Sequence, residues 1–105
     1  MANTTLVHVT RCDNELRITA IPAGGIGSME ILHMTSGFNN PVEYKVIPQS
    51  VLPAGSYILV LEGTNWGGPS GFNVILTTGG VPTPHAFGVG LPAGGVASQQ
   101  VPIIV

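Results

Sequence analysis

Glycine and proline recur along the whole chain and leave few stretches long enough for a helix. The 105 residues include 15 glycines and 9 prolines, and both residue types destabilise helix interiors. No long segment places apolar residues at positions i, i+3, i+4 and i+7, which is the pattern of an amphipathic helix. The chain therefore has to build its core from short extended segments, and we predict an all-β fold.

Short runs of alternating apolar and polar residues, separated by turn residues, indicate how many strands to expect. In Glu15–Ile21, for example, Leu16, Ile18 and Ala20 alternate with polar residues, so one side of the segment can face a core. We predict a single antiparallel β-sandwich, jelly-roll-like, of seven or eight short strands over residues 1–105. The expected strands are Thr4–Thr10, Glu15–Ile21, Ser28–Ser36, Val42–Ile47, Ser56–Glu62, Phe72–Thr77, a short strand near His85–Val89, and Val96–Val105.

Three features give this sandwich its expected details. Asp13 and Asn14 tolerate left-handed turn geometry, so they predict a tight turn between the first two strands. The segment Ser56–Glu62 is apolar on both faces, which is typical of a central strand covered on both sides. Pro102 cannot donate to a strand ladder, so it predicts that the last strand lies at a sheet edge.

Charge is scarce and unevenly placed, which limits the partners that the surface can attract. Charged residues make up 8% of the chain, against about 25% in an ordinary domain. The three Lys and Arg residues give no basic patch, so we expect neither nucleic acid nor anionic lipid as a partner. From Gly63 to Val105 no charged residue occurs. Such a surface suits a neutral ligand such as a sugar, or contact with another subunit.

The sequence also predicts where the protein resides. The first residues show neither the basic region nor the apolar run of a secretory signal, and no apolar stretch has the length of a membrane span. The single cysteine, Cys12, cannot form an internal disulfide and fits a reducing compartment. We therefore expect a cytoplasmic protein without a membrane span, with export by a route without such a signal as the alternative.

The loop Gly63–Gly71 is the candidate ligand site, because it combines the only tryptophan with polar and flexible residues. The face of Trp66 can stack on the C–H face of a sugar, and the side chain of Asn65 offers both a donor and an acceptor to hydroxyl groups. We predict that the ligand-binding residues are Thr64, Asn65, Trp66 and Ser70. The alternative is that Trp66 caps one end of the core and the glycines only permit the turns.

Two local resemblances bear on the function. The segment 55–76, GSYILVLEGTNWGGPSGFNVIL, resembles the C-terminal hairpin of small bacterial galactose-binding lectins, which supports a sugar and a calcium ion. That resemblance implies sugar binding. Here only Glu62 and Asn65 stand near the loop, too few ligands for a cation that takes six to eight oxygens. We therefore expect no calcium.

The segment Pro82-Thr83-Pro84-His85-Ala86-Phe87, together with the recurring Pro-Ala-Gly corners, resembles cupins, which are jelly-roll proteins. This resemblance implies a metal-dependent enzyme, whose site needs a paired His-x-His and a nearby glutamate. The chain lacks that pair, and its histidines, His8, His33 and His85, stand alone on separate expected strands. Unless they converge in space, we predict no metal, no cofactor and no catalytic residue, with Cys12 an ordinary turn cysteine.

These observations order three functional hypotheses. The first is a small lectin-like carbohydrate-binding protein that acts as a homo-oligomer, since several weak sugar sites gain affinity when they are linked. The second is a structural, self-assembling protein whose charge-free segment 81–105 forms the subunit interface or is exchanged between subunits. The third is a cupin-like metal-dependent enzyme.

Overall fold

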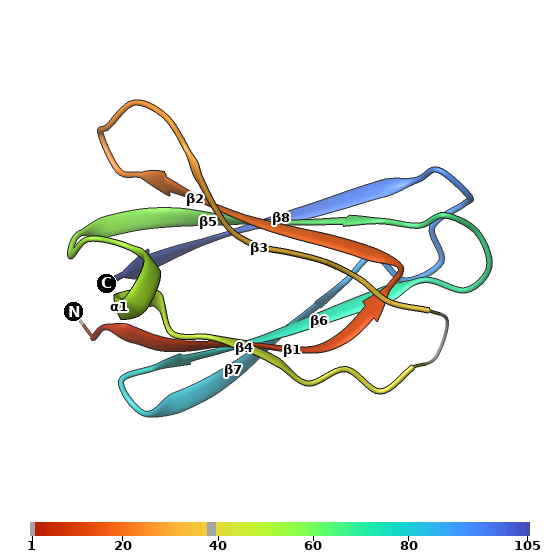
Figure 1. Ribbon diagram of the computed structural model, residues 1–105, viewed down its shortest axis with the longest axis horizontal. Coiled ribbons are helices and arrows are strands. Elements are labelled where there is room, and N and C mark those ends of the chain that lie inside the picture. The colour runs from red at the N-terminus through yellow and green to blue at the C-terminus, as the bar shows by residue number, and fades with distance from the viewer. Residues whose placement is uncertain (1, 38–39) are drawn as a thin grey trace.

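The protein is a β-sandwich of two four-stranded antiparallel sheets (Figure 1). The structure is a computed structural model that describes residues 2–37 and 40–105. It confirms the predicted small antiparallel β-sandwich. The elements are β1 (Thr4–Asp13), β2 (Glu15–Pro22), β3 (Met29–Thr35), β4 (Tyr44–Val46), α1 (Pro48–Val51), β5 (Ser56–Thr64), β6 (Gly71–Thr78), β7 (Val81–Phe87) and β8 (Val96–Ile104).

The strands of the two sheets correspond in pairs that are consecutive along the chain. The β1 sheet has the order β4-β1-β6-β7 and the β2 sheet the order β3-β2-β5-β8. The two strands of each pair β1/β2, β3/β4, β5/β6 and β7/β8 therefore occupy corresponding places in the two sheets. Three of the connections between the sheets, at residues 13–14, 65–70 and 88–95, lie at one end of the sandwich, the corner end (Figure 1). At the other end, the open end, lie the β6–β7 turn and α1, through which the chain crosses from β4 to β5 in the other sheet.

The prediction of a hairpin turn at Asp13 and Asn14 is wrong. β1 pairs with β4 and β6, whereas β2 pairs with β3 and β5, so these two residues carry the chain from one sheet to the other. Both are buried, and the backbone N–H of Asn14 donates to the carbonyl of Thr64 at 3.2 Å. The same tolerance for tight geometry that suits a turn also suits a buried corner.

The core lies between the sheets and is built from the inward-facing residues of six strands together with Val42, Leu52 and Val105. In β5 the inward residues Tyr57, Leu59 and Leu61 are buried. β5 is central in its sheet, between β2 and β8, as the sequence predicts. The expected cover on its second face is absent from the described residues, where Ile58 and Val60 are only half-buried.

The segment after β6 forms a longer strand than the sequence predicts. Gly79 and Gly80 have φ values of 58° and 78°, and they form a two-residue turn that leads directly into β7. The strand therefore spans Val81–Phe87 rather than the expected His85–Val89, and it includes Pro82 and Pro84. It can hold both prolines because it is an edge strand that pairs only with β6.

The last strand, β8, lies at the edge of the β2 sheet, as Pro102 predicts. The sequence does not predict the short α1, which begins at Pro48 with proline in the first turn. Such a short helix begins at one favourable residue and depends on tertiary packing for its stability. Within the described residues, no helix has the length and apolar character needed to cross a bilayer.

Candidate functional site

Charged side chains gather on the outer surface of the β2 sheet, near the corner end. The strand register places Arg17 between His33 of β3 and Glu62 of β5, and Glu15 next to Thr64. Of the eight charged residues in the chain, three basic and five acidic, four lie on this surface. We call it the polar face, and it comprises Glu15, Arg17, Glu30, His33, Glu62, Thr64 and the neighbouring Trp66.

A continuous set of hydrogen bonds and ion pairs joins five members of the polar face, which are Glu15, Arg17, Glu30, His33 and Trp66. The indole Nε1 of Trp66 donates to Glu15 Oε1 at 3.2 Å, and the other oxygen of Glu15 lies 2.6 Å from Nε2 of His33. Arg17 Nε donates to Glu30 Oε1 at 2.8 Å. Glu30 Oε1 also lies 3.9 Å from Nδ1 of His33. The tryptophan ring is thus tied to a charged network on two strands, β2 and β3.

The network changes the acidity of its central carboxyl group. Hydrogen bonds from His33 and from the Trp66 indole lower the pKa of Glu15 below its ordinary value. The positive charge of Arg17 contributes in the same direction. Glu15 therefore stays ionised at neutral pH, and it offers a carboxylate acceptor beside the exposed aromatic ring.

Two of the predicted ligand-binding side chains lie inside the corner end. Asn65 is 0% exposed, and its Nδ2 donates to the carbonyls of Gly68 at 2.9 Å and Leu91 at 2.7 Å. Its Oδ1 accepts from the N–H of Gly67 at 3.0 Å. The buried Ser70 hydroxyl donates to the carbonyl of Gly88 at 2.7 Å. These groups hold the 65–70 corner against the 88–95 corner.

The other two predicted residues lie at the surface. Trp66 is 56% exposed, and its backbone N–H is held by Asn14 Oδ1 at 2.9 Å. Thr64 is half-buried and pairs with Glu15. The sequence did not single out Glu15, Arg17, Glu30, His33 and Glu62 as partners of Trp66. Their outward position on alternating strands was the available signal, and their meeting depends on strand pairing.

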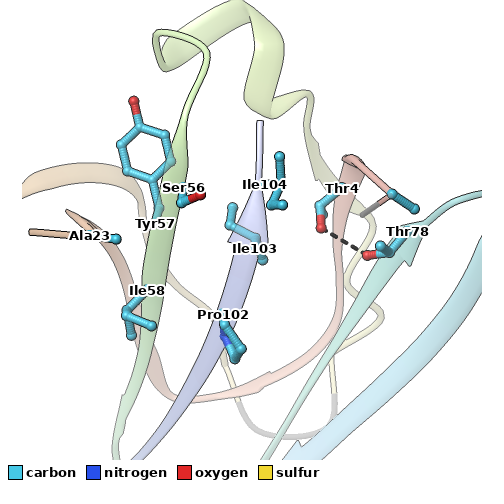
Figure 2. Close-up of a pocket in the computed structure, with 10 residues that line it drawn as sticks. Thr4, Ala23, Ser56, Tyr57, Ile58, Thr78, Pro102, Ile103 and Ile104 are labelled. Atoms are coloured by element: carbon cyan, nitrogen blue, oxygen red, sulfur yellow. Dashed lines mark hydrogen bonds between the residues drawn. The ribbon is translucent and has the colours of Figure 1, made fainter.

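A cavity opens at the open end of the sandwich (Figure 2). Its volume is about 270 Å³ and its lining is mainly apolar, including Ile58, Pro102 and Ile104. Thr4 and Thr78 also line it, and their hydroxyl oxygens lie 2.8 Å apart and share one hydrogen bond. The cavity is smaller than the roughly 300–1,000 Å³ of most ligand pockets, and it offers few partners for sugar hydroxyls. The polar face is the better candidate.

The described residues give no support to the metal-dependent alternative. His8 of β1 lies 2.9 Å from Glu43, His33 belongs to the polar face, and His85 lies on β7. Among residues 2–37 and 40–105, no group of three His, Cys, Asp or Glu side chains could hold a metal ion. Burial, with the charges of Asp13 and Glu15, raises the pKa of Cys12 to about 12, so its thiol is not a nucleophile at neutral pH.

Comparison with known proteins supplies no function for this chain. No family model matches it, and searches of curated proteins and of solved structures found no match. The likenesses to lectins and cupins are therefore short and local. Any proposal has to come from the geometry and chemistry of the polar face.

Proposed function

We propose that the protein is a lectin-like carbohydrate-binding protein, which holds a neutral sugar against Trp66 on the polar face and acts as a homo-oligomer. The observation that carries this proposal is the position of Trp66. Its ring is 56% exposed, yet it is fixed by hydrogen bonds to its indole and to its backbone N–H. A large aromatic surface that is held rigid in water costs little entropy when a ligand stacks on it.

The surroundings of the ring suit hydroxyl groups. The carboxylates of Glu15 and Glu62 accept hydrogen bonds, while the guanidinium of Arg17 donates them. Both carboxylates lie on the same outer surface as Arg17, because the strand register places Arg17 opposite Glu62. With three glutamates, one arginine and one histidine, the polar face carries more negative than positive charge. It therefore favours a neutral sugar over a phosphate or another anion.

Asn65 and Ser70 have a supporting role in this proposal. Their polar atoms hold the loop that carries Trp66. In this proposal the polar contacts with the sugar are made by Glu15, Arg17 and Glu62 instead. The resemblance to the lectin hairpin agrees with sugar binding, although it is carried by few residues.

Tryptophan fluorescence tests the proposal directly, because Trp66 is the only tryptophan. We expect titration with monosaccharides to change its emission and to saturate in the millimolar range, as is usual for a single weak sugar site. Trp66→Ala should abolish binding measured by calorimetry. Tyr44→Ala is the matched control, since Tyr44 is 49% exposed on β4 of the other sheet, and it should bind as the wild type does. Absence of binding to a full set of monosaccharides and glycans contradicts the proposal.

The alternative is a structural, self-assembling protein, which would also form a homo-oligomer but would bind no sugar. The charge-free strand β8 favours it, because it lies at a sheet edge. A stable oligomer that binds no glycan would favour this alternative. Protection of the segment 81–105 from protease only in the oligomer would support its exchange between subunits.

A further inference from the structure

Each sheet has two outer strands, and three of these four edges are poor sites for adding another strand. β4 has only three residues, and its neighbourhood carries Lys45 and the ion pair between His8 and Glu43. β3 carries Glu30 and His33, which are engaged in the polar face. Short strands and charged side chains are common ways of preventing edge-to-edge association.

The third edge, β7, is blocked by proline. The two-residue turn at Gly79-Gly80 makes Thr78 and Val81 a hydrogen-bonded pair. Hydrogen-bonded pairs alternate along an antiparallel ladder, so the even-numbered residues of β7 direct their backbone groups away from β6. Pro82 and Pro84 occupy these positions. Because proline lacks an N–H, the free edge of β7 has lost two donors.

The fourth edge, β8, is open over much of its length. Gly55 and Val105 exchange two backbone hydrogen bonds of 2.9 and 2.8 Å, and Asn65 N–H donates to the carbonyl of Gly95 at 3.0 Å. The odd-numbered residues of β8 therefore face β5, and the even-numbered ones point to the free edge. This row consists of Val96, Ser98, Gln100, Pro102 and Ile104, and it presents N–H groups at 96, 98 and 100 before Pro102 interrupts it.

We propose that this edge binds a second copy of the chain, with β8 paired antiparallel to β8 of the partner about a two-fold axis at Ser98. In this register Ser98 lies opposite Ser98 of the partner subunit, and Val96 lies opposite Gln100 of the partner subunit. No charged residue occurs on either strand, so no like charges meet. This pairing specifies the oligomer in the proposed function, but it does not depend on the sugar.

The properties of the four sheet edges indicate that the partner is a second copy of the chain. Since β3, β4 and β7 are poor sites for an added strand, β8 of another molecule is the most favourable partner for β8 among the edges in the described part of the chain. Such a contact is isologous and closes as a dimer, whereas pairing between two different edges would continue into a fibre. A single open edge is therefore consistent with a protein that associates once and stays dispersed.

The dimer would join two β2 sheets into one sheet and place two polar faces on the same surface. Five strand spacings would separate β2 of one copy from β2 of the other, which is about 24 Å at the usual spacing. Two sugar sites on one surface provide the linkage that raises the affinity for a branched or repeated glycan. The strands β7 and β8 remain paired within their own chain, so this interface needs no strand exchange.

Sedimentation velocity across a micromolar to millimolar concentration series tests the pairing. We expect a monomer–dimer equilibrium for the wild type. Ser98→Pro removes one free-edge N–H from each copy without touching the β5 ladder, so the dissociation constant should rise at least about thirtyfold. Ala86→Pro is the matched control, because it makes the same change on the free edge of β7, and it should leave the equilibrium unchanged. Circular dichroism checks that both variants fold.

Charge exchange at the two-fold axis tests the register. Ser98→Lys and Ser98→Glu should each be monomeric, because each would place two like charges opposite one another, and a mixture of the two should form a heterodimer. A wild type that stays monomeric throughout the series overturns the proposal. The proposal is overturned in that case even if a different extended peptide binds the edge of β8. A dimer that Ser98→Pro leaves intact overturns it as well. The sugar titration is a separate measurement, so its failure would not be mistaken for failure of the dimer.

Discussion

The two ends of the sandwich are closed in different ways. At the corner end, polar side chains are buried, among them Asn14, Asn65 and Ser70. At the open end the buried residues are mainly apolar, with Leu52, Tyr57, Ile103, Val105 and the hydroxyl of Thr4. The chain crosses between the sheets at both ends, and its N–H and C=O groups leave the ladders there and need other partners. At the corner end buried side chains supply these partners, whereas at the open end the backbone of α1 pairs with itself, as in the bond from Leu52 N–H to the carbonyl of Pro48 at 2.9 Å.

The comparison shows why a loop that looks like a binding site can be mostly scaffold. Asn65 and Trp66 are neighbours, yet one is fully buried and the other is 56% exposed. The amide of Asn65 replaces lost ladder bonds by reaching Gly68 and Leu91. Of these two side chains, only the exposed indole of Trp66 is accessible to a ligand. The predictions that follow compare the two ends, from the largest expected effect to the smallest.

Asn65→Ala should cause the largest loss of stability. The change removes two donors and one acceptor from a buried site, and it leaves the backbone carbonyls of Gly68 and Leu91 without that partner. We expect the free energy of unfolding to fall by about 2–4 kcal/mol, measured by urea denaturation. Asn73→Ala is the matched control, because its half-buried amide donates to the hydroxyl of Thr10. A loss at Asn73 as large as that at Asn65 would contradict this account of the corner end.

Ser70→Ala should show a smaller effect at the same end. The hydroxyl donates to Gly88 and accepts from the N–H of Leu91 at 2.8 Å, so its removal leaves two backbone groups unpaired. We expect a loss of about 1–2 kcal/mol. Thr4→Val is the corresponding change at the open end, where the lost bond joins Thr4 to the hydroxyl of Thr78. It should cost less than about 1 kcal/mol. Equal losses of unfolding free energy in Ser70→Ala and Thr4→Val would contradict the distinction between the two ends.

The sequence predicts the local elements well and the long-range contacts poorly. The alternation within Glu15–Ile21 and the apolar character of both faces of Ser56–Glu62 are properties of a few neighbouring residues, so these strands and the central place of β5 could be predicted. The corner at Asp13-Asn14 could not, because a turn and a crossing between sheets favour the same residue types. The polar face escaped prediction for a related reason: Glu15, His33 and Trp66 meet only after β2 has paired with both neighbours.

Acid should act on the exposed part of the corner end and leave its buried part intact. The pKa of Glu15 is lowered from 4.5, so its ionised form stabilises the folded state above that pH. This contribution is lost as the pH falls through the lowered pKa. Because the carboxyl group is exposed, we expect only a small decrease in the melting temperature between pH 5 and the acid limit of folding, together with a change in Trp66 emission as its indole loses a charged acceptor.

Glu15→Gln should remove this acid transition from the Trp66 fluorescence at every pH in the folded range. Glu43→Gln is its matched control, because Glu43 pairs with His8 on the other sheet, and it should leave the transition unchanged. A transition that persists in Glu15→Gln would show that Trp66 responds to another group. In that case the hydrogen bond between the indole and Glu15 would not be what holds the ring on the polar face, and the rigid aromatic platform proposed for the sugar would lose its principal support.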